Sequence, residues 1–296
     1  MRMDGQEESG NVHDVRGSSG GGRGGFGGLP IGGRGIGIGT VVVALIGGWI
    51  FGINPLTLLG MFAGGGDPQV VQQQERARAP AATGADPTPA TDPQVKFVSR
   101  VLRSTEQVWT PIFKQAGKTY QPAQLYVFSG GYSTACGYGQ AAMGPFYCPG
   151  DQSIYIDLRF FQQLEKQLGA PGEFAQAYVV AHEVGHHVQK LMGVMERTGS
   201  RPSNDTSVRT ELMADCFAGV WAAAAQKVEG GWRFSPGDIE AGLNAASKIG
   251  DDMMQRRQGG SVVPESFTHG SSAQRVQWFR RGLESGSVDS CNTFGS

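Results

Sequence analysis

The pattern of apolar and polar positions divides the chain into an N-terminal third and a globular remainder. Residues 1–35 are polar, rich in Gly and Ser and without apolar periodicity, so we expect a disordered head. Residues 36–62 run for 27 positions without an ionisable side chain. That length predicts one transmembrane helix, because about 20 apolar residues span a bilayer. Residues 63–93 have the Gly, Pro and Ala content of a flexible linker, and we expect the folded domain over 94–296.

The basic residues around the apolar segment predict its orientation. Arginines at positions 2, 16, 23 and 34 precede the segment, and the next basic residues are Arg76 and Arg78. The positive-inside rule then places the N-terminal head in the cytoplasm and the folded domain outside the cytoplasmic membrane, as a single-pass protein. A cleaved signal peptide is the alternative. The late start, the length and the missing Ala-x-Ala exit of the segment argue against it.

Apolar residues recur at helical spacing through most of the folded domain. Short β-prone pieces at 124–128, 146–148 and 153–156 lie between Gly-rich turns and predict a small antiparallel sheet. The fold class that follows is α+β, mostly helical with one small sheet. The predicted helices cover residues 95–117, 159–168, 173–195, 208–228, 237–258 and 273–283.

Composition excludes two classes of protein. The 25 Lys and Arg residues balance 26 Asp and Glu residues, and the net charge of −1 gives no basic excess for binding nucleic acid. Of the 47 glycines, 22 lie within the first 66 residues, but they follow no three-residue period, which excludes collagen.

The sequence His-Glu-Val-Gly-His at 182–186 lies on a predicted helix and matches a zinc-binding pattern. His182 and His186 are four residues apart, so both imidazoles lie on one helix face and can reach one ion. Glu183 can reach a water held by that ion and act as the general base. His187 points away from such an ion, and we expect it to be structural or exposed.

The next predicted helix supplies a third ligand. Glu211 and Asp215 are also four residues apart, and the simplest assignment makes Glu211 the ligand. Asp215 then accepts a hydrogen bond from the second ring nitrogen of a ligating histidine. The alternative is a pair of solvated acids, but the apolar residues around them indicate a buried helix.

A late segment at 266–275 contains the other histidine of the folded domain. His269 could donate a hydrogen bond to a developing oxyanion, and Arg275 could brace Glu211 or Asp215. A helix-capping loop with an incidental histidine is the alternative.

Three motifs resemble those of the neutral zinc metallopeptidase family of bacteria: HEVGHH at 182–187, ELMADCFAGVWA at 211–222 and FTHGSSAQRVQWF at 267–279. The likeness covers most of the chain, including the Gly-rich head, the apolar segment and residues 130–158. It implies a zincin-like catalytic domain with one Zn²⁺. The implied roles are ligands for His182, His186 and Glu211, general base for Glu183, transition-state group for His269, and support for Asp215 and Arg275.

Peptidases with this layout hold substrate as an added strand along a sheet edge, and residues 135–147 are the best edge candidate here. We therefore expect a membrane-anchored zinc metallopeptidase that hydrolyses peptide bonds as an endopeptidase, with a zinc-activated water. Its partners would be a peptide or protein substrate and, through residues 36–62, the lipid bilayer. The alternatives are a catalytically silent zinc-binding envelope scaffold and a zinc hydrolase of a non-peptide amide.

The four cysteines suit an extracytoplasmic domain with two disulfides. Cys136 and Cys148 flank a Gly-rich loop and form a natural hairpin pair. By elimination Cys216 pairs with Cys291. Cysteine zinc ligands are the rival interpretation, but no Cys-x-x-Cys spacing supports it.

Overall fold

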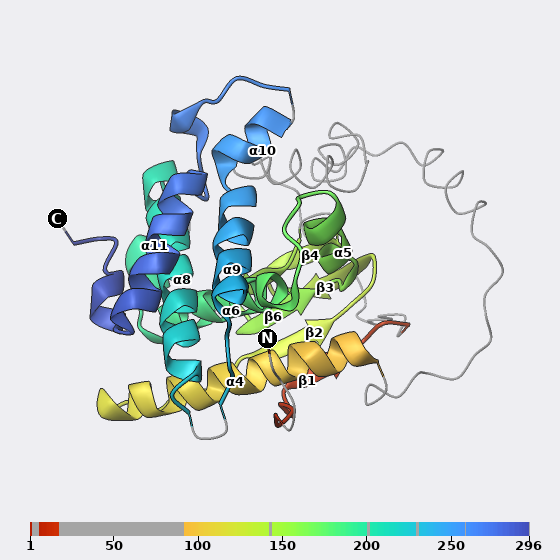
Figure 1. Cartoon of the computed structure of the whole chain (residues 1–296), viewed down its shortest axis with the longest axis vertical. Helices are drawn as coiled ribbons and strands as arrows, with labels where there is room; N and C mark the ends of the chain where they lie inside the picture. The colour runs from red at the N-terminus through yellow and green to blue at the C-terminus, as the bar shows by residue number, and fades with distance from the viewer. Residues whose placement is uncertain are drawn as a thin grey trace, which may run out of the picture.

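The computed structural model describes residues 1, 6–17, 92–141, 144–199, 202–228, 231–257 and 259–295. Figure 1 shows a small sheet beside a group of helices, with α8, α9 and α11 side by side and α4 crossing near one end of them. The helices are α4 (Pro93–Gln115), α5 (Arg159–Lys166), α6 (Glu173–Leu191), α7 (Val194–Thr198), α8 (Asn204–Ala225), α9 (Pro236–Lys248), α10 (Asp251–Arg257) and α11 (Ser272–Ser285), with 3-10 turns η3 (Pro264–Ser266) and η4 (Val288–Cys291).

The main sheet has four strands in the order β1 (Val12–Asp14), β2 (Gln124–Val127), β6 (Ser153–Ile156) and β5 (Phe146–Cys148). Within this sheet, β5 pairs with β6 in antiparallel orientation, whereas β1 with β2 and β2 with β6 are parallel. The prediction of an antiparallel sheet is therefore wrong for two of the three pairs. The chain between β2 and β6 is long enough for a crossover that leaves these strands parallel, whereas a four-residue connection joins β5 to β6.

A separate antiparallel hairpin, β3 (Gly131–Thr134) and β4 (Gly137–Gln140), follows β2. Within the predicted edge segment 135–147, β4 belongs to this hairpin. The two edge strands of the main sheet are β1 and β5, and β5 begins at Phe146. The expected position of the edge strand is thus corrected to the end of that segment.

The N-terminal head, predicted to be disordered over 1–35, contains a strand of the main sheet. Val12, His13 and Asp14 pair in register with Leu125, Tyr126 and Val127 of β2. The amide of Leu125 also donates to the carbonyl of Asn11 at 2.9 Å. The prediction of disorder is therefore wrong for this part of the head. The sequence pattern did not reveal the strand, because three residues are too few to show an apolar period.

The helical prediction needs two changes. Two helices replace the single helix expected over 237–258, and the helix is interrupted at Gly250. An added Cβ at Gly250 would lie 2.3 Å from the amide nitrogen of Ser272. The helix expected from 208 begins at Asn204, where the side chain of Ser203 accepts a hydrogen bond from the Thr206 amide and caps the helix. The mostly helical character of the domain is confirmed.

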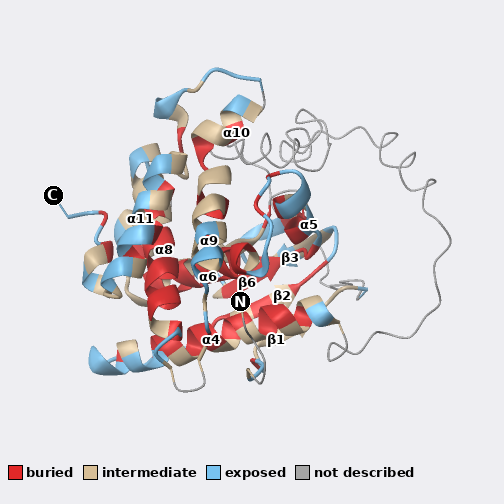
Figure 2. Cartoon of the chain, viewed as in Figure 1, coloured by how far each residue is buried: buried red, intermediate tan, exposed pale blue. Residues whose placement is uncertain are grey.

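Glycines at two helix–helix contacts allow the backbones of the central helices to pack directly against each other. At Gly185 of α6, an added Cβ would lie 2.9 Å from the carbonyl oxygen of Ala214 in α8. At Gly282 of α11, it would lie 1.9 Å from the carbonyl oxygen of Cys216, and Gly219 of α8 is equally close to α11. Figure 2 shows that α6 and α8 are largely buried where they meet. Helix α8 therefore lies between α6 and α11 at backbone-to-backbone distance.

Both predicted disulfides are present, and all four cysteines are paired. Cys136–Cys148 ties the β3–β4 turn to the end of β5. Cys216–Cys291 ties the C-terminal turn η4 to α8. These pairs exclude the cysteines as metal ligands in the oxidised protein.

The predicted transmembrane helix at 36–62 and all but the last two residues of the linker at 63–93 lie outside the described residues. Among the helices that the structure does describe, none combines the length and the apolarity that a membrane crossing requires.

We predict that Gly282→Ala destabilises the protein by about 1–3 kcal/mol or more, because the added methyl group forces α11 away from α8. Gly237→Ala is the matched control. Gly237 lies in the exposed first turn of α9, where the nearest atom to an added Cβ would be the Ser235 hydroxyl at 3.9 Å. Alanine there should change the free energy of unfolding by no more than about 1 kcal/mol. Urea unfolding measures both variants. Equal midpoints for the two variants would contradict the close helix contact.

Candidate active site

The two helices in contact at Gly185 bring three metal-binding side chains to one point. His182 and His186 lie one turn apart on α6, and Glu211 lies opposite them on α8. One Glu211 carboxylate oxygen is 3.1 Å from His182 Nε2, and the other is 3.5 Å from His186 Nε2. Three ligand atoms of this set lie within 4.8 Å of one another. The structure therefore brings together the three residues that the sequence proposed as ligands.

The spacing of these atoms fits a zinc ion. Ligand atoms about 2.0–2.2 Å from a tetrahedral ion lie about 3.3–3.6 Å apart. The distances of 3.1 Å and 3.5 Å from the two Glu211 oxygens to the histidine nitrogens are close to that range. The site also attracts positive charge: burial lowers the pKa of His182, but the charge of Asp215 and hydrogen bonds to Asp215 and Glu211 outweigh it and raise that pKa to about 10. A cation that binds at His182 Nε2 would take the place of this proton.

The outer nitrogen of each histidine has its own partner, which turns Nε2 toward Glu211. His182 Nδ1 lies 2.9 Å from Asp215 Oδ1, as the sequence predicted. His186 Nδ1 lies 2.9 Å from Gln189 Oε1, and the Gln189 amide nitrogen donates to the carbonyl of Thr210. That second bond orients the Gln189 amide so that its oxygen faces His186. The sequence analysis missed Gln189; its position three residues after His186 was the available signal.

A buried ion pair holds Asp215 in place. Arg275 donates from Nε to Asp215 Oδ2 at 2.8 Å and from Nη2 to Oδ1 at 2.9 Å, and Tyr178 donates its hydroxyl to the same carboxylate. Of the two partners expected for Arg275, the structure selects Asp215. Burial alone would raise the pKa of Asp215, but the charge of Arg275 and the contact with His182 lower it to about 2. Asp215 is therefore ionised at neutral pH, and it would support the His182 imidazole if that ring bound a metal ion.

Glu183 lies beside the ligands and faces the same cleft of about 790 Å³. Arg275 and Tyr178 bind Asp215 but not Glu183, and burial of the Glu183 carboxylate raises its pKa. A carboxylate with a raised pKa takes and returns a proton more readily near neutral pH. Its position and its protonation behaviour both suit a general base.

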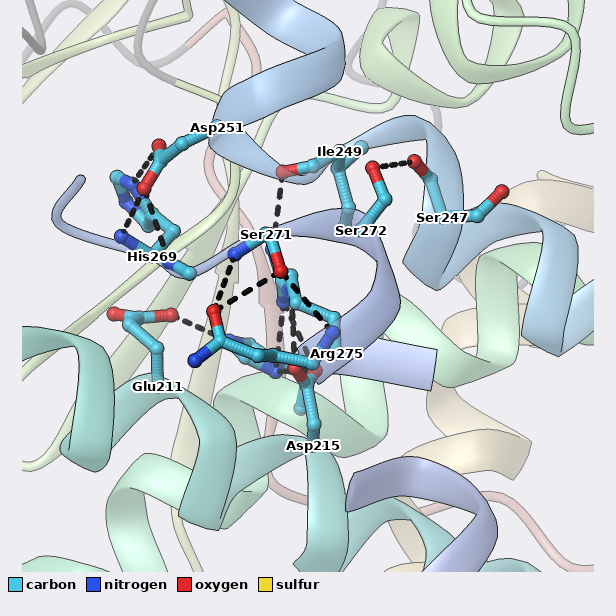
Figure 3. Close-up of polar contacts among 12 residues, drawn as sticks. Glu211, Asp215, Ser247, Ile249, Asp251, His269, Ser271, Ser272 and Arg275 are labelled. Atoms are coloured by element: carbon cyan, nitrogen blue, oxygen red, sulfur yellow. Dashed lines mark hydrogen bonds and ion pairs between the residues drawn. The ribbon is translucent and has the colours of Figure 1, made fainter. Parts of the chain in front are cut away.

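His269 reaches the cleft from a loop that Asp251 organises. Asp251 Oδ2 accepts hydrogen bonds from the backbone amides of Thr268, His269 and Gly270, and Oδ1 lies 3.2 Å from His269 Nδ1. Figure 3 shows Asp251 and His269 facing each other, with Glu211 close to them. Desolvation lowers the pKa of His269, but the bond to Asp251 and the charge of Glu211 outweigh it and raise that pKa.

The sequence analysis missed Asp251, because it predicted one continuous helix over 237–258 and placed Asp251 in the interior of that helix. Gly250, directly before it, was the available signal for a break. Burial raises the pKa of Asp251, but the bonds from His269 and the loop amides lower it below its usual value. Asp251 is therefore charged at neutral pH and holds His269 Nδ1, which leaves Nε2 toward the cleft.

His187 points away from the ligands, as its place on the helix predicts. It is fully buried, and its Nε2 lies 2.6 Å from the carbonyl oxygen of Gln121. Its Nδ1 lies 3.1 Å from the hydroxyl of Tyr147 on β5. His187 is therefore the structural residue of the two alternatives, and it fastens the edge strand to α6.

We predict that Glu211→Gln lowers zinc affinity by about tenfold to a hundredfold or more, because the site loses an anionic ligand between its two histidines. Glu240→Gln on the exposed face of α9 is the matched control and should bind zinc like the wild type. Competition with a fluorescent chelator measures both affinities. Wild-type affinity in the Glu211 variant would place the third ligand elsewhere.

The chain is similar in sequence to known proteins. A family model described as "Putative neutral zinc metallopeptidase" matches residues 1–294. Protein YpfJ of Escherichia coli is 46% identical over 303 residues, covering 100% of this chain and 99% of the relative. Protein Rv2575 of Mycobacterium tuberculosis is 43% identical over 203 residues, covering 65% of this chain and 68% of the relative. No solved structure matches the chain. The match over almost all of its residues makes the chain a member of this neutral zinc metallopeptidase family.

Proposed function

We propose that the chain is a zinc-dependent metallopeptidase that hydrolyses peptide bonds. The observation that carries the proposal is the meeting of His182, His186 and Glu211 at a cleft that Glu183 also faces. A site that only binds metal needs no carboxylate with a raised pKa beside its ligands. Glu183 therefore favours a hydrolase over a catalytically silent scaffold.

The residues around the ligands divide the chemistry between them. Zinc, when bound by His182, His186 and Glu211, lowers the pKa of a coordinated water and polarises a substrate carbonyl. Glu183 accepts a proton from the attacking water and donates it to the leaving amine. His269 donates a hydrogen bond to the negative charge that develops on the substrate oxygen.

Arg275 and Asp215 act through the ligands. Arg275 is bound to Asp215 and Tyr178, and a third bond reaches the carbonyl of Ile249. These contacts use its guanidinium, so Arg275 is a positioning residue that keeps Asp215 against His182. Its place at the cleft does not make it a substrate-binding cation.

The cleft suits an internal stretch of polypeptide. The edge strand β5 lines one wall with Phe146 and Tyr147, and an extended chain could pair along such an edge. Of the described residues that line the cleft, the two long cationic side chains are both ion-paired, Lys190 with Glu196 and Arg275 with Asp215. The described part of the cleft therefore offers no free lysine or arginine to a substrate carboxyl terminus, which favours endopeptidase activity.

The two disulfides support a location outside the cytoplasm, because reducing compartments keep thiols unpaired. Residues 36–62 carry no ionisable side chain, and their composition supports attachment to a lipid bilayer. We therefore propose that the peptidase works at the outer face of the cytoplasmic membrane.

We predict that Glu183→Gln retains zinc but lowers peptide hydrolysis by about a hundredfold to ten-thousandfold, because the amide cannot accept the proton of water. Zinc content and digestion of a peptide library, with and without chelator, measure the two properties. Undiminished hydrolysis by the variant would remove Glu183 as the base. Absence of any chelator-sensitive cleavage by the wild type would contradict the peptidase proposal itself.

We predict that Asp251→Asn moves the alkaline limb of the pH profile of kcat/KM to lower pH. The raised pKa of His269 keeps its imidazole protonated over a wider range, and activity that needs this proton falls as pH rises through that pKa. Loss of the Asp251 charge lowers the pKa of His269. Asp289→Asn, at an exposed position in η4, is the control. An unmoved alkaline limb in the Asp251 variant would separate His269 from the reaction.

A further inference from the structure

The N-terminal segment 6–17 is built into the catalytic domain. Its strand β1 forms one side of the main sheet, and the amide of Val15 extends the pairing by donating to the carbonyl of Val127 at 2.9 Å. The carbonyl of Ser9 accepts from the Ser99 hydroxyl, and the amide of Ser9 donates to the Ser99 carbonyl. These backbone contacts join the segment to both β2 and α4.

A buried carboxylate depends on the same segment. Glu106 of α4 is 6% exposed. Its Oε1 accepts a hydrogen bond from the hydroxyl of Ser9 at 2.5 Å and another from the side-chain amide of Asn11 at 2.8 Å, and Arg103 Nη1 lies 3.3 Å from Oε2. Without the segment, the carboxylate would keep only the long contact to Arg103, and an under-paired buried charge is costly. The segment therefore completes the interior of the domain.

The two ends of the long connection 18–91 meet at one point. Arg16 Nη2 lies 2.8 Å from Asp92 Oδ2, and the same guanidinium binds Asp14. Asp92 is also the N-cap of α4, because its side chain accepts from the amide of Gln94 at 2.8 Å. The chain thus leaves the domain at Arg16 and returns to it at the residue paired with Arg16.

We propose that residues 6–17 and the catalytic cleft lie on the same side of any membrane that the chain enters. The chain between Arg16 and Asp92 then crosses that membrane an even number of times or not at all. Two crossings need about 40 apolar residues, whereas residues 36–62 are a run of only 27 positions without an ionisable side chain. The single-pass arrangement with a cytoplasmic head, expected from the sequence, is incompatible with this sheet. Arg16, one of the four arginines behind that expectation, is ion-paired with Asp14 and Asp92 of the folded domain.

Cysteine labelling in the full chain tests the proposal. Gly10→Cys places a thiol in the N-terminal segment, at an exposed position with no atom within 4 Å of the added Cβ. Glu240→Cys places one on the exposed face of α9 in the catalytic domain. Bacterial cells that express each variant are stripped of their wall and treated with a membrane-impermeant maleimide, before and after permeabilisation. The wild type, whose cysteines are all paired, is the background control.

We expect both thiols to react in the same state of the cells. Reaction of one thiol in intact cells, with the other protected until permeabilisation, would overturn the proposal. The labelling pattern does not depend on catalysis, so failure of the peptidase proposal would leave it unchanged.

A second variant tests whether the segment is docked in the full-length protein. Ser9→Ala removes a hydrogen bond to buried Glu106, and we expect it to lower the urea midpoint of the catalytic domain. Ser261→Ala, at an exposed position after α10, should leave that midpoint unchanged. Identical midpoints for both variants would contradict the docking on which the proposal rests.

Discussion

The candidate site depends on how closely α8 approaches α6. His182 and His186 come from one helix turn and are aligned by helix geometry alone, but the third ligand belongs to a different helix. Gly185 lies between the two histidines and has no side chain, so the backbone of α8 at Ala214 can approach α6 closely; a Cβ at Gly185 would lie 2.9 Å from the Ala214 carbonyl oxygen. Glu211 lies one turn before Ala214, so this contact sets its distance from both imidazoles. A glycine inside the histidine motif thus serves packing, and packing completes the metal site.

The helix contact also arranges the charges behind the ligands. Gly219 and Gly282 bring α11 still closer to α8, and Arg275 of α11 reaches Asp215 from there. Positive and negative groups then alternate from Arg275 through Asp215 to His182. Because Arg275 and Asp215 are almost completely buried, each needs the other to remain charged. The same end of α11 follows the loop that carries His269, which Asp251 fastens to α10. The candidate metal ligands and His269, which we propose as the transition-state group, therefore share one support.

Features that depend on local spacing could be predicted from the sequence. His182, Glu183 and His186 lie within one turn, and Glu211 and Asp215 within another, so helical periodicity was enough to propose them. Asp251 and Gln189 could not be found in this way. Asp251 follows a helix break at Gly250 that periodicity does not show, and Gln189 acts through a hydrogen bond to Thr210 on another helix. Strand β1 is three residues long and pairs with a strand more than a hundred residues away, which no local pattern encodes.

X-ray absorption at the zinc edge of the purified full-length protein tests the central claim most directly. We expect nitrogen and oxygen neighbours at about 2.0–2.2 Å from the zinc, with the outer scattering of two imidazole rings. A sulfur shell at about 2.3 Å, or scattering from fewer than two imidazoles, would contradict a centre built from His182, His186 and Glu211.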